Sequence, residues 1–371
     1  MTSQKPRLLS LDVMRGVTIA AMTLVNNPGD WEHIYAPLEH SRWDGCTPTD
    51  MIFPFFLFMV GVSVVYAMET KKADAANHGK MIWGALRRMA LLIVISWFIQ
   101  LFYHHSISHL RLMGVLPRIA IVFFICSILY IKTSQKTRDW VLAGSLIGYY
   151  VIINFIPVPG YGAANLNPET NFGAWLDRLL LGTNHLWAES KTWDPEGILG
   201  TLPAIGTCLL GIHAGTWLKR SDREDSLKVT WLFVFGTLAI IAGLVWGMFF
   251  PINKALWTSS FVLYTGGLAI MALALSYWLI DVQGRKKYIW VFVVFGMNAI
   301  TAYVLGDLLQ GMIDLNFLKL GGNGITAAFY HNFIAPYFNP YNASLVRAII
   351  YLILTWLPML WLYKKKIYIK V

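Results

Sequence analysis

The chain has 371 residues, of which 56% are hydrophobic and 13% are charged, and its formal net charge is +10. Soluble domains usually carry about 25% charged residues, so this composition excludes a soluble globular enzyme, a disordered chain and a coiled coil. The apolar stretches run over about 20 residues, whereas the strands of a transmembrane β-barrel alternate over about ten. The composition therefore predicts an all-α polytopic membrane protein.

Ten segments are apolar enough to cross a bilayer, which takes about 20 mainly apolar residues. They cover residues 9–29, 50–68, 81–103, 113–131, 139–157, 197–218, 229–250, 259–280, 288–309 and 345–363. A weaker stretch at 322–337 is short and contains Gly, Asn, His and Pro, so the sequence leaves open whether it crosses the membrane, re-enters it or lies on its surface. We expect a single integral membrane domain over residues 1–371, with an extracytoplasmic loop at 158–196 between the fifth and sixth of about ten transmembrane helices.

The basic residues of the loops are distributed unevenly, and this asymmetry predicts the orientation. If the N-terminus is cytoplasmic, the inside segments hold 21 of the 30 lysines and arginines, the outside segments hold 7, and two lie within helices. We therefore expect both termini in the cytoplasm. Most of the positive charge then faces anionic lipid, so no nucleic-acid partner is needed to explain it.

Histidine and cysteine give little support for a metal site. The cysteines Cys46, Cys126 and Cys208 are scattered, with no CxxC pair. His104, His105 and His109 form an HHxxxH pattern on a short outside loop, but no carboxylate accompanies them. We expect no bound metal.

His40 lies in the string LEHSRWDG, close to the start of the second predicted helix. A histidine can act as a general base near neutral pH. Glu39, Asp44 and Asp50 surround it in sequence, and any of them could orient the imidazole. A lone loop histidine is more often simply solvated, and His33 is a local competitor.

Polar residues interrupt or end several predicted helices. Asn26, before Pro28 and Gly29, either caps the first helix or donates its amide to a developing oxyanion. Asp12 and Arg15 share a helical face and form either a structural ion pair or a contact with an anionic ligand. Arg118 needs a counter-charge, which an internal acid such as Asp307 or a phosphate would supply equally well.

Two outside segments combine charged and aromatic residues. Asp194 and Glu196 in WDPEG fit the start of the sixth helix, where Asp caps the helix and Glu favours its positive end. A functional use of this pair would be additional to that local role. Lys254 and Trp257 in PINKALWTSS either belong to the membrane interface or bind an anion or a sugar.

Six strings, in this order, resemble the heparan-α-glucosaminide N-acetyltransferase family of transmembrane acyltransferases. They are SLDVMRGVTIAAMTLVNNPG, LEHSRWDGCTPTDMIFPFFLFMVGVS, RLMGVLPRIA, WDPEGILGTLPAIGTCLLGIHAG, PINKALWTSSFVL and GMNAITAYV, and they extend from residue 7 to about residue 304. The resemblance implies transfer of an acetyl group from cytosolic acetyl-CoA to the amino group of a glucosamine-type sugar on the opposite side of the membrane. The family's catalytic histidine lies in an HxxWNG-type string, here HSRWDG, which implies His40. Its VN asparagine corresponds to Asn26.

On this reading, His40, Asn26 and Asp50 are the expected catalytic residues, with Asp44 as the alternative to Asp50. Arg15 and Arg118 are expected to bind the acetyl-CoA phosphates. The expected acceptor site comprises Asp44, Asp194, Glu196, Lys254, Trp257 and Asn298. The sequence leaves open whether His40 acts as a base or carries the acetyl group itself.

The lysosomal family members carry an additional N-terminal region and span, so we expect a bacterial relative in the inner membrane, with its active-site loops facing the periplasm. An amino sugar or small glycan is then the expected acceptor, and the sequence leaves its identity and a homodimeric state open. Two alternative functions remain: a secondary transporter for a small solute such as an amino sugar, and an O-acyltransferase acting on a glycan. The absence of a clear internal repeat disfavours the transporter.

Overall fold

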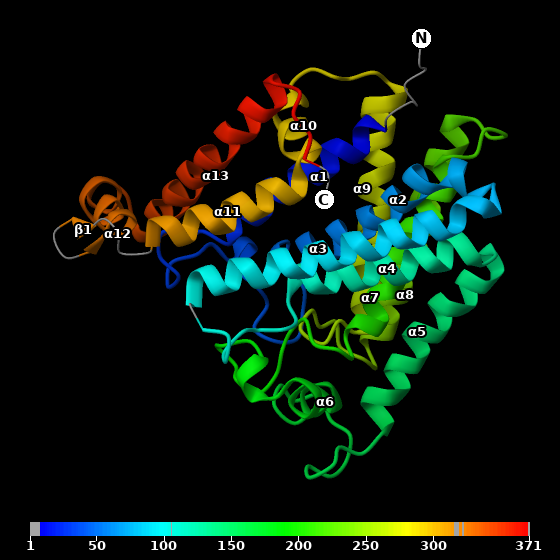
Figure 1. Ribbon diagram of the computed structural model, residues 1–371, viewed down its shortest axis with the longest axis horizontal. Coiled ribbons are helices and arrows are strands. Elements are labelled where there is room, and N and C mark those ends of the chain that lie inside the picture. The colour runs from blue at the N-terminus through cyan, green and yellow to red at the C-terminus, as the bar shows by residue number, and fades with distance from the viewer. Residues whose placement is uncertain (1–7, 105, 315–318, 321–322, 370–371) are drawn as a thin grey trace. The chain divides into compact units, whose positions relative to one another are not determined.

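The computed structural model describes residues 8–104, 106–314, 319–320 and 323–369 (Figure 1). Within these ranges the regular secondary structure is helical apart from one short two-stranded pair, which confirms the predicted all-α fold. The chain divides into two compact units. Unit 1 comprises Met1–His40, Thr47–Ile52 and Leu275–Val371, and unit 2 comprises Ser41–Cys46 and Phe53–Ala274. The expectation of one domain over residues 1–371 stays a prediction.

Unit 1 is built around its first helix. α1 (Leu9–Val25) packs against α10 (Trp290–Met297), α11 (Ala299–Asp314) and α13 (Pro340–Lys364). Glycines allow the closest of these approaches: a β-carbon on Gly16 of α1 would lie 1.8 Å from the carbonyl oxygen of Phe292, and one on Gly296 of α10 would lie 1.8 Å from that of Asp12. Small residues at such crossings let helix backbones come into contact.

Short elements complete unit 1. The antiparallel pair β1 (Lys319–Leu320) and β2 (Asn323–Gly324) precedes α12 (Ile325–Phe329), a π-helical turn (Tyr330–Ile334) and a 3₁₀ turn (Ala335–Tyr337). Two more 3₁₀ turns lie at Ala36–Leu38 and Thr49–Met51, and the second of them contacts α1.

Unit 2 holds the helices from α2 to α9, apart from the first residue of α2 and the last residues of α9, which belong to unit 1. Their bounds are α2 (Ile52–Lys72), α3 (His78–His104), α4 (Val115–Lys132), α5 (Gln135–Phe155), α6 (Phe172–Leu181), α7 (Thr201–Leu218), α8 (Asp225–Gly247) and α9 (Ser259–Tyr277). A 3₁₀ turn (Ala75–Asn77) precedes α3, another (Thr183–His185) follows α6, and a π-helical segment (Trp278–Val282) follows α9. α3 and α4 run side by side (Figure 1), and α7 packs against both α4 and α5.

Close packing of α2 on α7 again depends on glycine. A β-carbon on Gly61 would lie 2.0 Å from the carbonyl oxygen of Cys208, and one on Gly211 would lie 2.0 Å from that of Phe58. The two helices therefore meet backbone to backbone. Leu57, Val62 and Leu209, near this contact, are fully buried.

Each of the ten predicted segments coincides with a helix or a pair of helices, but the structure supports fewer spans. Among the described residues, six helices are long and apolar enough to cross a membrane: Thr49–Lys72, Ala75–Phe102, Val115–Lys132, Asp225–Gly247, Ser259–Val282 and Pro340–Lys364. Counting the bent pair α10 and α11 as one span gives seven. The predicted count of ten is therefore not confirmed, and the orientation of the termini stays a prediction.

Two predicted segments differ from the structure in shape. The expected helix at 288–309 is broken at Asn298, where α10 and α11 meet at 83°. Asn298 leaves the helical conformation (φ −129°, ψ 43°), and its side chain bonds elsewhere. The stretch at 158–196 was expected as a loop, but it contains α6, which begins where the Asn171 side chain accepts a hydrogen bond from the N–H of Ala174.

Candidate active site

His40 and Asp50 form a close pair in unit 1. The Nδ1 atom of His40 lies 2.6 Å from Oδ1 of Asp50, and the Asp50 side chain is 1% exposed whereas that of His40 is 51% exposed. A buried carboxylate holds such a contact more strongly than a solvated one, because water competes less. With Asp50 ionised, the Nδ1–H donates to it, and the lone pair of the neutral imidazole is then on Nε2.

The local sequence explains why Asp50 holds a fixed position. Asp50 lies in the 3₁₀ turn Thr49–Met51, and its second oxygen accepts hydrogen bonds from the backbone N–H (3.0 Å) and the hydroxyl (3.2 Å) of Thr47. The same Thr47 hydroxyl lies 2.6 Å from the carbonyl oxygen of Glu39. Thr49 donates to the carbonyl of Pro37 at 3.1 Å. These contacts tie the turn that carries Asp50 to the segment that leads into His40.

A second histidine–aspartate pair lies nearby in sequence. Nδ1 of His33 is 2.7 Å from Oδ2 of Asp30, but both side chains are about one-third exposed. The backbone N–H of Glu32 and the His33 side chain bond to this carboxylate and lower the pKa of Asp30. The His33 ring packs edge-on against Tyr341 at 5.4 Å. The pair resembles His40–Asp50 in its contact distance and differs from it in the exposure of the carboxylate.

Asn26 is exposed at the C-cap of α1, and its backbone N–H donates to the carbonyl of Met22 at 3.0 Å. The next residue, Asn27, is buried and donates its amide to the carbonyl of Thr23 at 2.8 Å. Nη1 of Arg347 donates to the carbonyls of Asn27 (3.0 Å) and Pro28 (3.1 Å). The end of the helix is thus fixed by Asn27 and Arg347, and Asn26 is the asparagine with an exposed side chain.

Two other predicted residues of unit 1 have structural contacts. Nη1 of Arg15 lies 3.3 Å from Oδ1 of Asp12, as their spacing predicts. Asn298 is buried; its amide donates to the carbonyl of Ile367 at 3.0 Å and accepts from the N–H of Ile369 at 2.9 Å. The side-chain amide of Asn298 therefore binds the C-terminal segment of the chain.

In unit 2, the segment Ser41–Cys46 is fastened to two distant loops. The indole N–H of Trp43 donates to the carbonyl of Leu166 at 3.1 Å. Asp44 accepts a hydrogen bond of 3.2 Å from the amide of Asn253, and the N–H of Gly45 donates to Ile252 at 2.7 Å. The strings HSRWDG and PINKALWT, which are far apart in sequence, therefore contact each other through Asp44 and Asn253, and the imidazole's carboxylate partner is Asp50.

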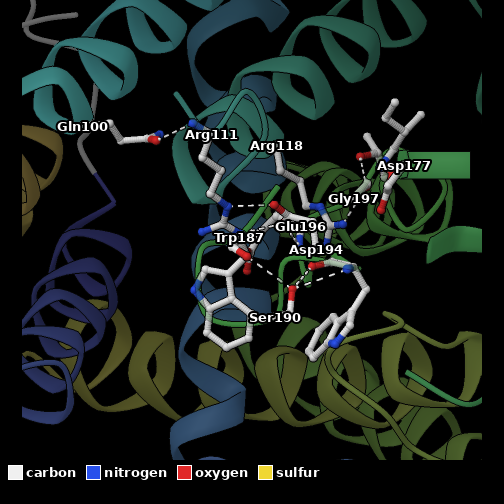
Figure 2. Close-up of polar contacts among 12 residues, drawn as sticks. Gln100, Arg111, Arg118, Asp177, Trp187, Ser190, Asp194, Glu196 and Gly197 are labelled. Atoms are coloured by element: carbon white, nitrogen blue, oxygen red, sulfur yellow. Dashed lines mark hydrogen bonds and ion pairs between the residues drawn. The ribbon is translucent and has the colours of Figure 1, made fainter. Parts of the chain in front are cut away.

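Asp194 and Glu196 both bind Arg111. In the sequence analysis, Arg111 is only one of the basic residues counted in the outside loops. Arg111 donates Nε and Nη2 to the two oxygens of Asp194 (2.7 and 2.6 Å) and Nη2 to Glu196 (2.5 Å) (Figure 2). The Asp194 side chain is fully buried, and that of Glu196 is 9% exposed. Burial alone would lower the pKa of Arg111, but the hydrogen bonds and charges of Asp194 and Glu196 more than offset it, so the pKa is raised. This is a charge-assisted network that excludes most of the surrounding water.

Arg118 lies near the N-terminal end of α4 and is fully buried. Nη2 donates to the carbonyl of Gly197 at 2.9 Å, and the guanidinium carbon lies 5.2 Å from the ring centre of Trp257. Its Nε and Nη1 have no hydrogen-bond partner among the described residues. In Figure 2, Arg111 and Arg118 both point toward the segment that carries Asp194 and Glu196. A buried guanidinium with two unused donors favours an acceptor group from a ligand.

Arg118 also lines a small, partly open pocket, whose empty volume of about 300 Å³ includes open solvent. The other polar lining residues include Asp177, Asp194 and Asn171, and the ring of Trp193 forms part of the wall. Burial raises the pKa of Asp177 to about 7, although a hydrogen bond from the N–H of Ile198 lowers it. The pocket thus combines unused donors, a carboxyl group that titrates near neutrality and an aromatic wall.

Two glycines of the string DPEGILG make room for this arrangement. A β-carbon on Gly197 would lie 1.9 Å from Oδ2 of Asp177, and one on Gly200 would lie 2.8 Å from Nη2 of Arg118. The absence of a β-carbon at both positions therefore lets the backbone pack directly against the side chains of Asp177 and Arg118.

Trp257 belongs to the core of unit 2. It is fully buried, its indole N–H donates to the hydroxyl of Thr207 at 3.1 Å, and its ring packs against Phe53 and Phe261. Its ring therefore has no exposed face for an acceptor. Lys254 precedes it in the turn that leads into α9.

No cluster of three or more metal-ligating side chains occurs in the described ranges. His105 of the HHxxxH pattern lies outside the described residues.

Sequence reasoning missed Arg111, Asp177 and Asn253, which are polar residues on connecting segments or on a short helix. The one available pattern was the string RLMGVLPR, in which Arg111 and Arg118 are seven residues apart, so that both could meet the same neighbouring segment. Nothing in the sequence pairs Asn253 with Asp44.

The apolar helices and the buried polar sites define an all-α integral membrane protein. Residues 7–245 match the family model described as "Heparan-alpha-glucosaminide N-acetyltransferase, catalytic", and the chain belongs to this family. The matched region contains His40, Asp50 and the whole Arg111–Asp194–Glu196 network.

Two relatives carry the name heparan-alpha-glucosaminide N-acetyltransferase. The human protein is 28% identical over 378 residues, covering 87% of this chain and 56% of its own length. The mouse protein is 28% identical over 363 residues, covering 83% of this chain and 54% of its own length. The chain thus spans about half the length of the curated relatives it matches.

Proposed function

We propose that the protein is a membrane acetyltransferase that moves an acetyl group from acetyl-CoA to the amino group of a glucosamine-type sugar. The observation that carries this proposal is the His40–Asp50 contact of 2.6 Å within the family's catalytic region. The names of the human and mouse relatives support an N-acetyltransferase. Placement in a bacterial inner membrane, with the acceptor on the periplasmic side, is part of the proposal, and the distribution of basic loop residues supports its orientation.

His40 is the proposed general base. Its Nε2 takes a proton from the acceptor's amino group as the amine nitrogen attacks the thioester carbonyl carbon. The carbon–sulfur bond then breaks, and the CoA thiolate leaves and receives the proton from the imidazolium. Asp50 holds the imidazole in the required tautomer and stabilises its charged form. Alternatively, Nε2 attacks the thioester itself and passes the acetyl group to the amine in a second step.

Asn26 is the proposed donor to the tetrahedral oxyanion, because its side chain is exposed whereas Asn27 is buried and bonded. Removing one such donor typically costs about 10²–10³-fold in rate. Arg15 remains the proposed contact in unit 1 for a phosphate of the donor.

The pocket of unit 2 is the proposed binding site for a sugar unit of the acceptor. Arg118, which the sequence predicts as a contact for the acetyl-CoA phosphates, is proposed here to donate Nε and Nη1 to sugar hydroxyls instead, beside the Asp177 carboxyl. Trp193 supplies an aromatic surface of the kind on which sugar rings pack. Asp194 and Glu196 position this wall through Arg111.

The test measures CoA release from acetyl-CoA by the purified protein in detergent, with glucosamine, with a neutral sugar and with no acceptor. The variants are His40→Ala and the matched control His33→Ala, which removes the more exposed histidine of the other pair. We expect glucosamine-dependent release that His40→Ala reduces by at least about 10²-fold and His33→Ala leaves unchanged. Full activity of His40→Ala would refute the assignment of the base.

Secondary transport of a small solute is the second candidate, because discontinuous helices such as α10 and α11 commonly form transporter binding sites. Uptake of glucosamine into proteoliposomes without consumption of acetyl-CoA would favour it. Release that depends on a neutral sugar hydroxyl would instead favour O-acetyl transfer.

A further inference from the structure

One end of unit 2, formed by the C-terminal ends of α2, α4 and α7 and the start of α5, gathers cations around a buried tyrosine. Nζ of Lys72 lies 4.3 Å from the ring centre of Tyr130, and the guanidinium carbon of Arg138 lies 5.2 Å from it. Tyr130 is 1% exposed and Arg138 is 4% exposed. We call Lys72, Tyr130 and Arg138 the Tyr130 cluster. It lies about 18 Å along α4 from Arg118, since twelve residues of helix separate Tyr130 from Arg118.

Several buried polar atoms at this end lack a partner. Of the ten buried side-chain nitrogen and oxygen atoms without a hydrogen bond in the described structure, six lie on the adjoining segments of α3, α4, α5 and α7. They are Arg88 Nε, Ser127 Oγ, Tyr130 Oη, Arg138 Nε, Thr216 Oγ1 and His213 Nε2, of which His213 Nε2 does have an ion-pair partner, Oδ1 of Asp139 at 3.3 Å. Arg138 does use Nη1, which donates to the carbonyl of Thr133 at 2.7 Å. Buried polar atoms usually have partners, so such a concentration indicates a missing one.

The carboxylates present do not balance the cations. Glu69 and Asp139 are the nearby acids, and Asp139 pairs with His213 at 3.3 Å. In the described ranges, no carboxylate forms an ion pair with Lys72, Arg88 or Arg138. Buried cations without an anion are costly, and a ligand anion would remove that cost.

The positive charge extends along α4 from the cluster. The guanidinium carbon of Arg88 lies 4.8 Å from the ring centre of Phe123, and Phe123, Ser127 and Tyr130 share one face of α4 at helical spacing. Seven residues of helix span about 10 Å. The donors are therefore spread over a length that suits more than one phosphate group.

A purely structural role would explain part of this arrangement. Stacking on Tyr130 accounts for the positions of Lys72 and Arg138. It does not use their N–H donors, however, and it leaves the hydroxyls of Tyr130 and Ser127 unbonded. A phosphate offers several strong acceptor oxygens to these groups at once.

We propose that the Tyr130 cluster, extended by Arg88 and Ser127, is a phosphate-binding site. Its ligand is a phosphate or pyrophosphate group, which either the nucleotide end of CoA or an anionic lipid headgroup could present. As a site for CoA it rests on the proposed acetyltransferase function, and it adds a donor-binding region to the proposed phosphate contact Arg15.

The test uses the full-length protein with a Lys72→Met, Arg138→Met double variant. The matched control is Lys71→Met, Lys136→Met, because both of these lysines lie beside the cluster in sequence and are exposed. CoA and phosphate-free pantetheine are titrated in an uncharged detergent. In a parallel arm, thermal stabilisation is measured in nanodiscs of phosphatidylglycerol and of phosphatidylcholine.

If CoA supplies the phosphate, the double variant binds CoA about 10–100-fold more weakly than the control does, with pantetheine binding unchanged. If lipid supplies it, the double variant loses the stabilisation by phosphatidylglycerol over phosphatidylcholine and keeps its CoA affinity. Retention of both by a folded double variant would overturn the proposal. Absence of CoA binding by the wild-type protein would refute the proposed function instead, and the lipid arm would still decide the phosphate site.

A charge-preserving variant distinguishes the loss of a phosphate site from a loss of folding in the double methionine variant. Lys72→Arg with Arg138→Lys keeps both cations and should retain most of the phosphate-dependent binding. If this variant is as defective as the double methionine variant while its melting temperature equals that of the wild type, charge is not what the site provides and the proposal fails.

Discussion

Replacing Arg111 with methionine should destabilise unit 2 strongly, because it leaves two buried carboxylates without their cation. Arg111 makes three hydrogen bonds of 2.5–2.7 Å to side chains that are 0% and 9% exposed. Removing one partner of a buried ion pair typically costs about 3–5 kcal/mol. The separate contributions of three hydrogen bonds to charged groups would sum to more than this, but contributions within one network are not additive. We therefore expect a loss of about 3–5 kcal/mol in unfolding free energy.

Denaturant titration of the purified protein in a neutral detergent, followed by tryptophan fluorescence, measures this loss. Arg220→Met is the matched control, because Arg220 also binds Asp222 with two nitrogens (2.9 and 2.6 Å) but both side chains are exposed. The control should unfold at nearly the wild-type denaturant concentration, since solvent screens an exposed pair.

A triple variant separates lost charge balance from lost packing. Adding Asp194→Asn and Glu196→Gln to Arg111→Met removes the buried charges while keeping the shapes of the acidic side chains, so it should recover a large part of the lost stability. Equal midpoints for Arg111→Met and Arg220→Met would refute the reasoning. So would a triple variant that is less stable than Arg111→Met.

Three further predictions concern catalysis, packing and pH. Asp50→Asn should lower glucosamine-dependent transfer by about 10²–10⁴-fold with little change in KM, whereas Asp30→Asn should not; equal effects in the CoA-release assay would contradict the assigned tautomer role. Gly61→Ala should lower the unfolding free energy by at least about 1–3 kcal/mol, because its β-carbon would lie 2.0 Å from a carbonyl oxygen. The control Gly144→Ala should be neutral or stabilising, because the added β-carbon would lie in open space. Because the folded-state pKa of Asp177 is raised from 3.8 to about 7, its proton is bound more tightly in the folded state, and stability falls as pH rises from about 4 to about 7. Melting curves should show that Asp177→Asn removes this decrease; parallel wild-type and variant curves would show that the carboxyl is not responsible.

The sequence predicted where helices lie better than it predicted how they run. Apolar stretches found every long helix, because hydropathy averaged over about 20 residues is insensitive to single positions. For the same reason it did not predict the break at Asn298, which depends on one backbone conformation and on bonds to residues about 70 positions away. It also found more spans than the helices support by length and hydropathy together: α1 has only 17 residues, and α5 and α7 are not among the candidate spans although they have 21 and 18 residues.

For the candidate site, sequence reasoning worked over short separations and failed over long ones. It placed Asp50 among three acids near His40, but only the 3₁₀ turn Thr49–Met51 and its Thr47 contacts show which acid faces the ring. The Arg111–Asp194 pair joins residues 83 positions apart, and no periodicity connects them. Residue type also did not predict that Trp257 is buried, because tryptophan occurs both in protein cores and at binding surfaces.

The Asn298 side chain has a practical consequence for work with this protein. Its amide bonds the carbonyl of Ile367 and the N–H of Ile369, which is how one residue of a neighbouring parallel strand would bond residues i and i+2 through its own N–H and C=O. The Asn298 side chain therefore makes the hydrogen bonds to Ile367 and Ile369 that a neighbouring strand would otherwise make. Deleting residues 366–371, or pulling on them through an affinity tag, would strip both bonds from an amide that is 2% exposed and would loosen the junction of α10 and α11.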